Sequence, residues 1–171
     1  MLATKQVNAG IVVWGVSLSM SDASSVSDGP GYAGDLSVDE AWALLSSDPA
    51  AVLIDVRTAA EWSYVGVPDL ESLGKTLLTV EWVSHPGNAR NADFANQVQE
   101  QVQALKASND APLLMLCRSG VRSKGAATVM TEAGYARCYN IAGGFEGDLD
   151  EQKHRGNTGG WKVAELPWVQ K

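Results

Sequence analysis

The sequence predicts an α/β fold, in which a mostly parallel sheet is covered by helices on both faces. Two observations support this prediction. First, short apolar runs of strand length alternate along the chain with segments of helical periodicity, which is the order expected of strand–helix–strand units. Second, residues 112–116 form the continuous apolar run Pro-Leu-Leu-Met-Leu, which is typical of a strand buried on both faces of a parallel sheet.

Two capping boxes predict where the first helices begin. Ser37 with Glu40, and Thr58 with Glu61, have the spacing at which a hydroxyl and a carboxylate each satisfy a free backbone N–H group at a helix start. Two further helices are expected from apolar residues at helical spacing in the segments 94–105 and 126–133, and Gly134 follows the second of these as a helix end.

Strands are predicted from apolar, β-branched runs of suitable length between these helices. They are expected at residues 51–56, 77–82, 112–116 and 137–141. The intervening stretch 83–91, which contains His85, Pro86 and Gly87, is expected to be a loop.

The length of 171 residues, with 45% hydrophobic and 19% charged residues, indicates one globular domain with a sizeable core. Residues 1–30 are interpreted as an N-terminal extension or linker, residues 31–150 as the domain, and residues 151–171 as a C-terminal tail that packs on the domain. The linker composition, rich in Ser, Gly and Asp, continues from Ser21 to Gly34.

Charge and cysteine content exclude several classes of function. The net charge of −7 argues against broad binding to nucleic acid or anionic lipid. The apolar run 11–16 is too short to span a bilayer and makes a weak signal peptide, so a cytoplasmic location is expected, with export as the alternative. Cys117 and Cys138 have no metal-ligand spacing with each other, His85 or His154; two free thiols in a reducing compartment and no metal site are therefore expected.

The chemistry is expected in the loop after the buried strand, because ligands of parallel sheets bind beyond the carboxyl ends of the strands. Cys117 follows that strand, and the next helix begins within a few residues. Helix-opening amides and two nearby arginines favour the thiolate form of this cysteine, and Gly120 lets successive amides turn inward to hold an anion. An inert, buried cysteine is the structural alternative. The candidate loop residues are Arg118, Ser119, Gly120, Val121, Arg122 and Ser123.

Three ordered motifs resemble those of the single-domain rhodanese-like sulfurtransferases over about residues 35–149. They are the cysteine loop 117–123, the segment Asp55-Val56-Arg57 followed by Glu61-Trp62, and the segment 140–145, Asn-Ile-Ala-Gly-Gly-Phe. Two features depart from the family pattern, since residues 64–69 lack a His and no Trp directly follows Phe145. The resemblance implies a rhodanese-like domain with a five-stranded central sheet.

The resemblance also implies a sulfur-transfer reaction without a cofactor. The Cys117 thiolate would take a sulfane sulfur from a small anionic donor such as thiosulfate and become a persulfide, which cyanide, a cellular thiol or a protein acceptor would then discharge. Arg118 and Arg122 are expected to hold the donor. Asp55 and Arg57 are expected to form a supporting ion pair, Glu61 to act as a helix cap, and Cys138 to be a packing residue.

Two alternatives remain at this stage. A cysteine-dependent phosphatase uses a similar thiolate and arginine, but its loop is one residue longer than the present one, in which four residues separate Cys117 from Arg122. A non-catalytic rhodanese-like module for binding or sulfur carriage is the second alternative. Turnover of an aryl phosphate would favour the phosphatase. Failure to accept sulfur from thiosulfate would favour the non-catalytic module.

Overall fold

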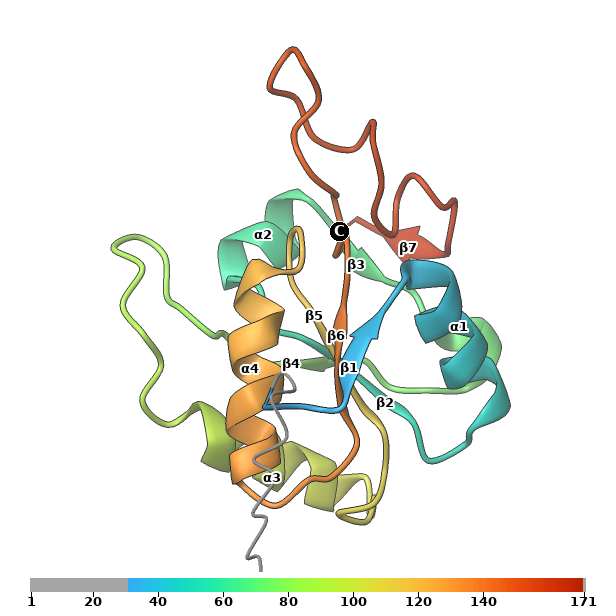
Figure 1. The fold of residues 1–171 in the computed structure, drawn as a ribbon, viewed down its shortest axis with the longest axis vertical. Coiled ribbons are helices and arrows are strands. Elements are labelled where there is room, and N and C mark those ends of the chain that lie inside the picture. The colour runs from blue at the N-terminus through green and yellow to red at the C-terminus, as the bar shows by residue number, and fades with distance from the viewer. Residues whose placement is uncertain (1–30, 171) are drawn as a thin grey trace, which may run out of the picture.

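The computed structural model describes residues 31–170 and contains a central sheet of five parallel strands (Figure 1). The strands, in spatial order, are β1 (Gly34–Leu36), β6 (Cys138–Ile141), β5 (Leu113–Leu116), β2 (Val52–Asp55) and β4 (Leu78–Thr79). Every neighbouring pair is parallel. The predicted α/β class with a parallel sheet is therefore confirmed.

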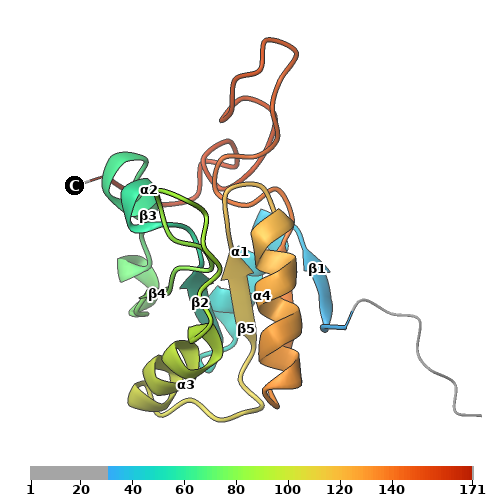
Figure 2. The same ribbon diagram turned by 90° about the vertical axis from the view of Figure 1, so that its left-hand side faces the viewer.

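Helices cover both faces of this sheet, as predicted (Figures 1 and 2). Both predicted capping boxes form, Ser37 with Glu40 and Thr58 with Glu61. In each, the hydroxyl accepts a hydrogen bond from the backbone N–H group of the glutamate, and the carboxylate accepts one from the backbone N–H group of the hydroxyl residue. The helices are α1 (Val38–Ser47), α2 (Ala59–Tyr64), α3 (Phe94–Ala104) and α4 (Val121–Glu132), with a short 3-10 helix, η1 (Glu71–Leu73).

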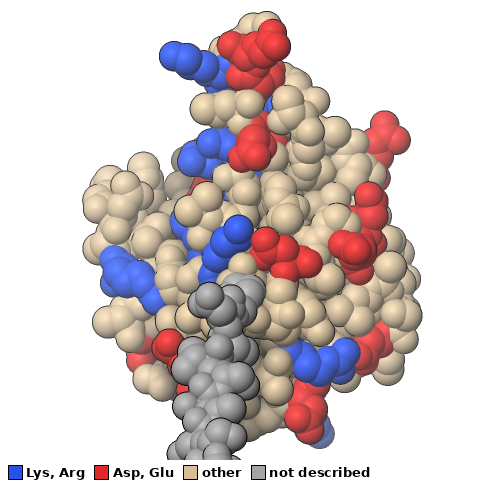
Figure 3. Space-filling model, in the orientation of Figure 1, with Lys and Arg blue, Asp and Glu red and all other residues tan. Residues whose placement is uncertain are grey.

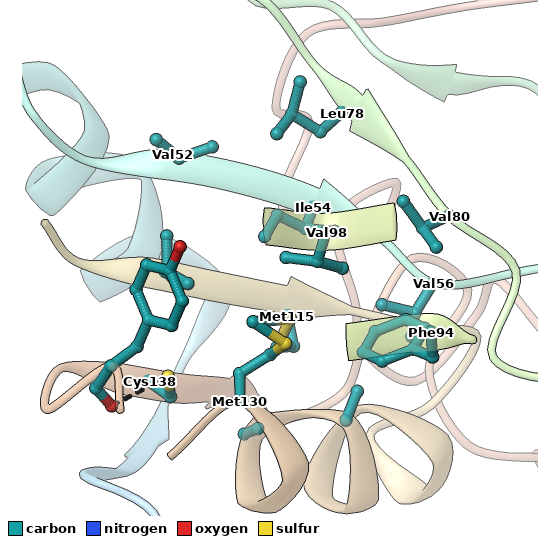
Figure 4. Packing of buried hydrophobic residues seen from close by; sticks show 14 of the residues in the cluster. Val52, Ile54, Val56, Leu78, Val80, Phe94, Val98, Met115, Met130 and Cys138 are labelled. Atoms are coloured by element: carbon teal, nitrogen blue, oxygen red, sulfur yellow. Dashed lines mark hydrogen bonds between the residues drawn. The ribbon is translucent and has the colours of Figure 1, made fainter. Parts of the chain in front are cut away.

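Alternate residues of the central strands enter two separate apolar cores. Ile54 of β2 and Met115 of β5 face α3 and α4, where they pack near Val98 and Met130 (Figure 4). Their neighbours Leu53 and Leu114 belong to the second cluster, together with α1. Burial on both faces explains the unbroken apolar runs in these strands, and each buried Leu or Ile contributes about 1.5–3 kcal/mol.

The predicted linker was expected to continue to Gly34, but the edge strand β1 already begins at this residue. The linker prediction is wrong at this end because Gly34 pairs with Tyr139 in the β1–β6 register. Asp35 fixes the strand, since its Oδ1 accepts hydrogen bonds from Tyr32 Oη at 2.7 Å and from Asn140 Nδ2 at 3.0 Å. Three residues are too few to show strand periodicity. The interpretation of residues 1–30 lies outside the described residues.

At the opposite edge of the sheet, the predicted strand 77–82 contributes only the two residues of β4. The following loop 83–91 is present, closed by an antiparallel bridge between Val83 and Arg90. Arg90 stacks on the ring of Trp82. Within residues 31–170, no helix has both the length and the apolar character that a membrane crossing requires.

The C-terminal segment packs on the domain through Trp161, whose side chain is fully buried. Its ring meets that of Trp42 edge-to-face at 5.7 Å, and its Nε1 donates to the carbonyl oxygen of Pro167 at 2.8 Å. Further along, β7 (Trp168–Val169) pairs antiparallel with β3 (Val67–Pro68). Trp161, with Ala164 and Leu166 packed beside it, thus completes the apolar core on the α1 side of the sheet.

We predict that Trp161→Ala lowers the free energy of unfolding by about 3–5 kcal/mol, because it empties the centre of a packed core. Chemical denaturation measures this loss. Trp168→Ala is the matched control, since this side chain is 38% exposed and should lose clearly less stability. Equal losses in the two variants would contradict the anchoring role of Trp161.

Candidate active site

The loop between β5 and α4 lies at the carboxyl edge of the sheet, beneath the C-terminal loop (Figure 2). A cavity of about 730 Å³ opens there, and four separate segments line it. These segments are the loop 117–122, helix α2 with the preceding Thr58, the loop 83–88, and the chain around Glu146 and Arg155. The predicted cysteine loop therefore forms one wall of a cavity.

Cys117 directly follows β5 and is almost completely buried, with 1% of its surface exposed. Its Sγ accepts a hydrogen bond from the backbone N–H group of Gly120 at 3.1 Å, and Ser123 Oγ lies 3.1 Å away. Gly120 has a φ of +100° and immediately precedes α4, a conformation that glycine adopts without steric cost. The sulfur thus sits at the amino end of a helix, where the backbone presents partial positive charge.

Behind the cysteine loop, the turn 143–146 accepts no side chain at Gly144. A Cβ atom there would collide with backbone atoms of Cys117, Arg118 and Ser119. This close approach allows Phe145 N and Glu146 N to donate hydrogen bonds to the carbonyl oxygens of Cys117 and Arg118, at 2.8 and 2.9 Å. These two loop carbonyls are therefore satisfied by the backbone of the turn.

Asp55 and Arg57 form a fully buried ion pair at the end of β2. Arg57 Nε lies 2.9 Å from Asp55 Oδ1, and its Nη2 donates to the carbonyl oxygen of Gly66 at 2.7 Å. The guanidinium also stacks on the ring of Phe145, at 4.1 Å. This pair links three segments beneath the cavity and does not line it.

Arg122 is bound by Glu61, a partner that the sequence analysis treated only as a helix cap. Arg122 Nη1 and Nη2 donate to the two carboxylate oxygens of Glu61 at 2.8 and 2.6 Å. Burial alone raises the pKa of Glu61, but the hydrogen bonds from Arg122 and Thr58 and the charge of Arg122 outweigh this and lower it to about 2. The charge of Arg122 is thereby compensated within the protein.

Three of the other predicted loop residues line the cavity. Arg118 is exposed, Ser119 is half-buried and Val121 is 78% exposed at the rim. Ser123 is buried beneath Cys117, and its Oγ lies 2.6 Å from Asn140 Oδ1. Of the predicted loop residues, Gly120 and Ser123 therefore contact the sulfur of Cys117, whereas Arg118, Ser119, Val121 and Arg122 line the cavity around it.

Several lining residues were not predicted as part of the site. They come from outside the cysteine loop and are Tyr64, Val83, His85, Asn88, Glu146 and Arg155. No local motif marks them, because they reach the cavity only through the packing of distant segments. Among residues 31–170, no group of three or more His, Cys, Asp or Glu side chains is arranged to hold a metal ion.

Cys138 lies away from the cavity, in the core beneath α4. It pairs with Leu113 in the β5–β6 register, so Cys117 is about 13 Å further along the neighbouring strand. A disulfide between the two cysteines requires Cα atoms within about 7 Å. Burial raises the pKa of Cys138 to about 11 although a hydrogen bond with Thr131 opposes the shift, so this thiol stays protonated at neutral pH.

Charged side chains are unevenly distributed on the surface. In Figure 3, Asp and Glu gather mainly on the right-hand side, which is the side of α1 in Figure 1, whereas most Lys and Arg lie towards the centre and left. The net charge of −7 therefore does not describe every part of the surface. The charge at the cavity depends on the charged side chains that line it, which are Glu61, Arg118, Arg122, Glu146 and Arg155.

The chain was compared with families and curated proteins. A family model described as the STR4 middle domain matches residues 33–171. A Rickettsia rickettsii protein, the "RP600 homolog", is 36% identical over 129 residues, covering 75% of this chain and 91% of the relative. Thiosulfate sulfurtransferase GlpE of Haemophilus influenzae is 28% identical over 128 residues, covering 75% of this chain and 87% of GlpE.

Among solved structures, the crystal structure of Rv0390 from M. tuberculosis superposes with a TM-score of 0.74 and is 46% identical. The match covers 82% of this chain and 99% of Rv0390. The similarity therefore extends over most of this chain and nearly all of Rv0390.

We predict that the Glu61–Arg122 ion pair makes stability sensitive to acid. Because the pKa of Glu61 falls from 4.5 to about 2 on folding, its contribution is present above pH 4.5 and is lost as the pH falls towards 2. Glu61→Gln should therefore be less stable than the native chain at neutral pH, and this difference should shrink as the pH falls through that range.

Denaturation at a series of pH values measures this difference. Glu100→Gln is the control, because Glu100 is exposed on α3 and the substitution changes the net charge equally. A difference between native and Glu61→Gln that stays constant from pH 7 to pH 2 would exclude the ion pair as its source.

Proposed function

The chain belongs to the rhodanese-like sulfurtransferase family, and we propose that it moves a sulfane sulfur from an anionic donor such as thiosulfate to a thiol or cyanide acceptor, through a persulfide on Cys117. The observation that carries the proposal is the position of Cys117 Sγ, which accepts the Gly120 N–H group at the floor of an open cavity. A backbone N–H group in this position stabilises negative charge that develops on the sulfur.

The reaction proceeds in two displacements. In the first, the Cys117 thiolate attacks the outer sulfur of thiosulfate, a new S–S bond forms, and sulfite leaves with the electron pair of the broken bond. In the second, the acceptor attacks the outer sulfur of the persulfide and restores the thiolate; cyanide becomes thiocyanate, and a thiol becomes a persulfide. The charge that moves onto the outer sulfur is stabilised by amides at the start of α4.

The dimensions of the loop favour sulfur over a phosphate group. Cys117 and Arg122 are separated by four residues, and Arg122 is held by two hydrogen bonds to Glu61. A phosphatase of the cysteine-dependent type needs an arginine that is free to bind the phosphate oxygens. The similarity to thiosulfate sulfurtransferase GlpE supports thiosulfate as the donor.

The proposed reaction uses no cofactor or metal, because the sulfur is carried covalently on Cys117. The acceptor is a small thiol, cyanide or a protein thiol. We propose a cytoplasmic location for this reaction, because a reducing compartment keeps a thiol nucleophile free.

The experiment is intact-protein mass spectrometry after incubation with thiosulfate. The native chain should gain one sulfur atom, lose it again on addition of cyanide, and release thiocyanate. Cys117→Ser should show neither the added sulfur nor thiocyanate, because the attacking atom is gone.

Cys138→Ser is the matched control, and it should behave like the native chain because Cys138 is buried away from the cavity. A native mass that does not change with thiosulfate or with other sulfane donors would favour a binding module. Cys117-dependent hydrolysis of an aryl phosphate without sulfur transfer would favour a phosphatase.

A further inference from the structure

The arginines at the cavity are not equivalent. Arg122 places both terminal nitrogens on Glu61, so a carboxylate already compensates its charge, and moving the guanidinium to a substrate would break a bidentate ion pair. Within the described part of the chain, neither Arg118 nor Arg155 forms an ion pair. Both line the cavity, and Glu146 is the other charged group on that wall.

Arg155 is delivered to the cavity by the C-terminal loop. Its side chain is half-buried, and its Nη1 donates to the carbonyl oxygen of Gly147 at 2.6 Å. The backbone next to it is also fixed, because Gly156 N donates to the carbonyl oxygen of Glu146 at 2.7 Å. One nitrogen thus anchors the guanidinium, and the remaining N–H groups are available to a ligand.

A short ladder of main-chain hydrogen bonds joins Arg155 to the cysteine loop. Glu146 N donates to the carbonyl oxygen of Arg118, and Glu146 accepts in turn from Gly156. Asp150 stabilises the far end of the C-terminal loop by accepting hydrogen bonds from His154 N at 2.7 Å and Asn157 Nδ2 at 2.6 Å. Arg118 and Arg155 are therefore held on segments that are connected through a single residue.

We propose that Arg155, together with Arg118, binds the oxyanion group of the sulfur donor, and that Arg122 does not. This inference rests on the proposed function and specifies the donor as a sulfane sulfur attached to a sulfonate, as in thiosulfate. A guanidinium matches two oxygens of such a group through paired N–H donors. As sulfite leaves, the two arginines compensate the negative charge that collects on its oxygens.

Arg155→Gln tests this role, because glutamine removes the charge and keeps a polar side chain. The KM for thiosulfate should rise about tenfold, the scale of a lost charged hydrogen bond at a half-exposed position, while kcat changes little. Arg155→Lys should restore part of the loss. Lys153→Gln is the matched control, since Lys153 is exposed in the same loop and the change in net charge is identical.

Alkylation of Cys117 gives a second measurement that requires no sulfur transfer. Iodoacetate and iodoacetamide both form an S–C bond with release of iodide, but only iodoacetate carries a negative charge. Arg155→Gln should slow the reaction with iodoacetate several-fold and leave the reaction with iodoacetamide unchanged. A merely structural role for Arg155 would alter both rates together.

The outcomes separate the inference from the proposed function. If the native chain accepts no sulfur but Arg155→Gln selectively slows iodoacetate, the anion subsite stands and the sulfurtransferase proposal fails. If the native chain transfers sulfur and the Arg155→Gln and Lys153→Gln proteins agree in KM and in both alkylation rates, the proposed function stands and the subsite is excluded.

Discussion

The hydrogen bonds from Phe145 and Glu146 to the carbonyl oxygens of Cys117 and Arg118 are the contacts on which the site depends. They satisfy two carbonyl oxygens of the loop within the protein, and the amide of Gly120 is directed at the sulfur. A loop with its carbonyls inward would repel an anionic sulfur instead of stabilising it. The bare backbone of Gly144 makes this arrangement sterically possible.

Two ion pairs, one buried and one half-buried, lie near this loop, and in each of them an arginine near the cavity is neutralised by a carboxylate. The Asp55–Arg57 pair is sealed beneath it, and the Glu61–Arg122 pair closes one wall. Removing one partner from a buried pair leaves the other charge uncompensated, which is strongly destabilising. These supporting charges are thus neutralised in pairs, whereas Arg118 and Arg155 line the cavity without a carboxylate partner among the described residues.

The local parts of the fold were predictable because their signals are short-range. The capping boxes at Ser37 and Thr58 depend on residues three positions apart, and the buried strand β5 shows its burial in its own composition. The edge strand β1 was missed because three residues carry no periodicity. The strands β3 and β7 pair with each other although about a hundred residues of chain separate them. No local sequence pattern predicts such a pairing.

By itself, the sequence predicted the candidate nucleophile and the loop around it: a cysteine after a buried strand, a glycine that turns the amides, and a helix that begins within a few residues. These features lie within one continuous segment, so their chemistry is local. The tertiary structure alone decided which charges are free. Glu61 lies 61 residues before Arg122 and occupies its guanidinium because α2 packs beside the start of α4, and Arg155 reaches the cavity because the C-terminal loop folds back on Glu146. Both outcomes arise from the packing of distant segments, in which spacing along the chain has no part.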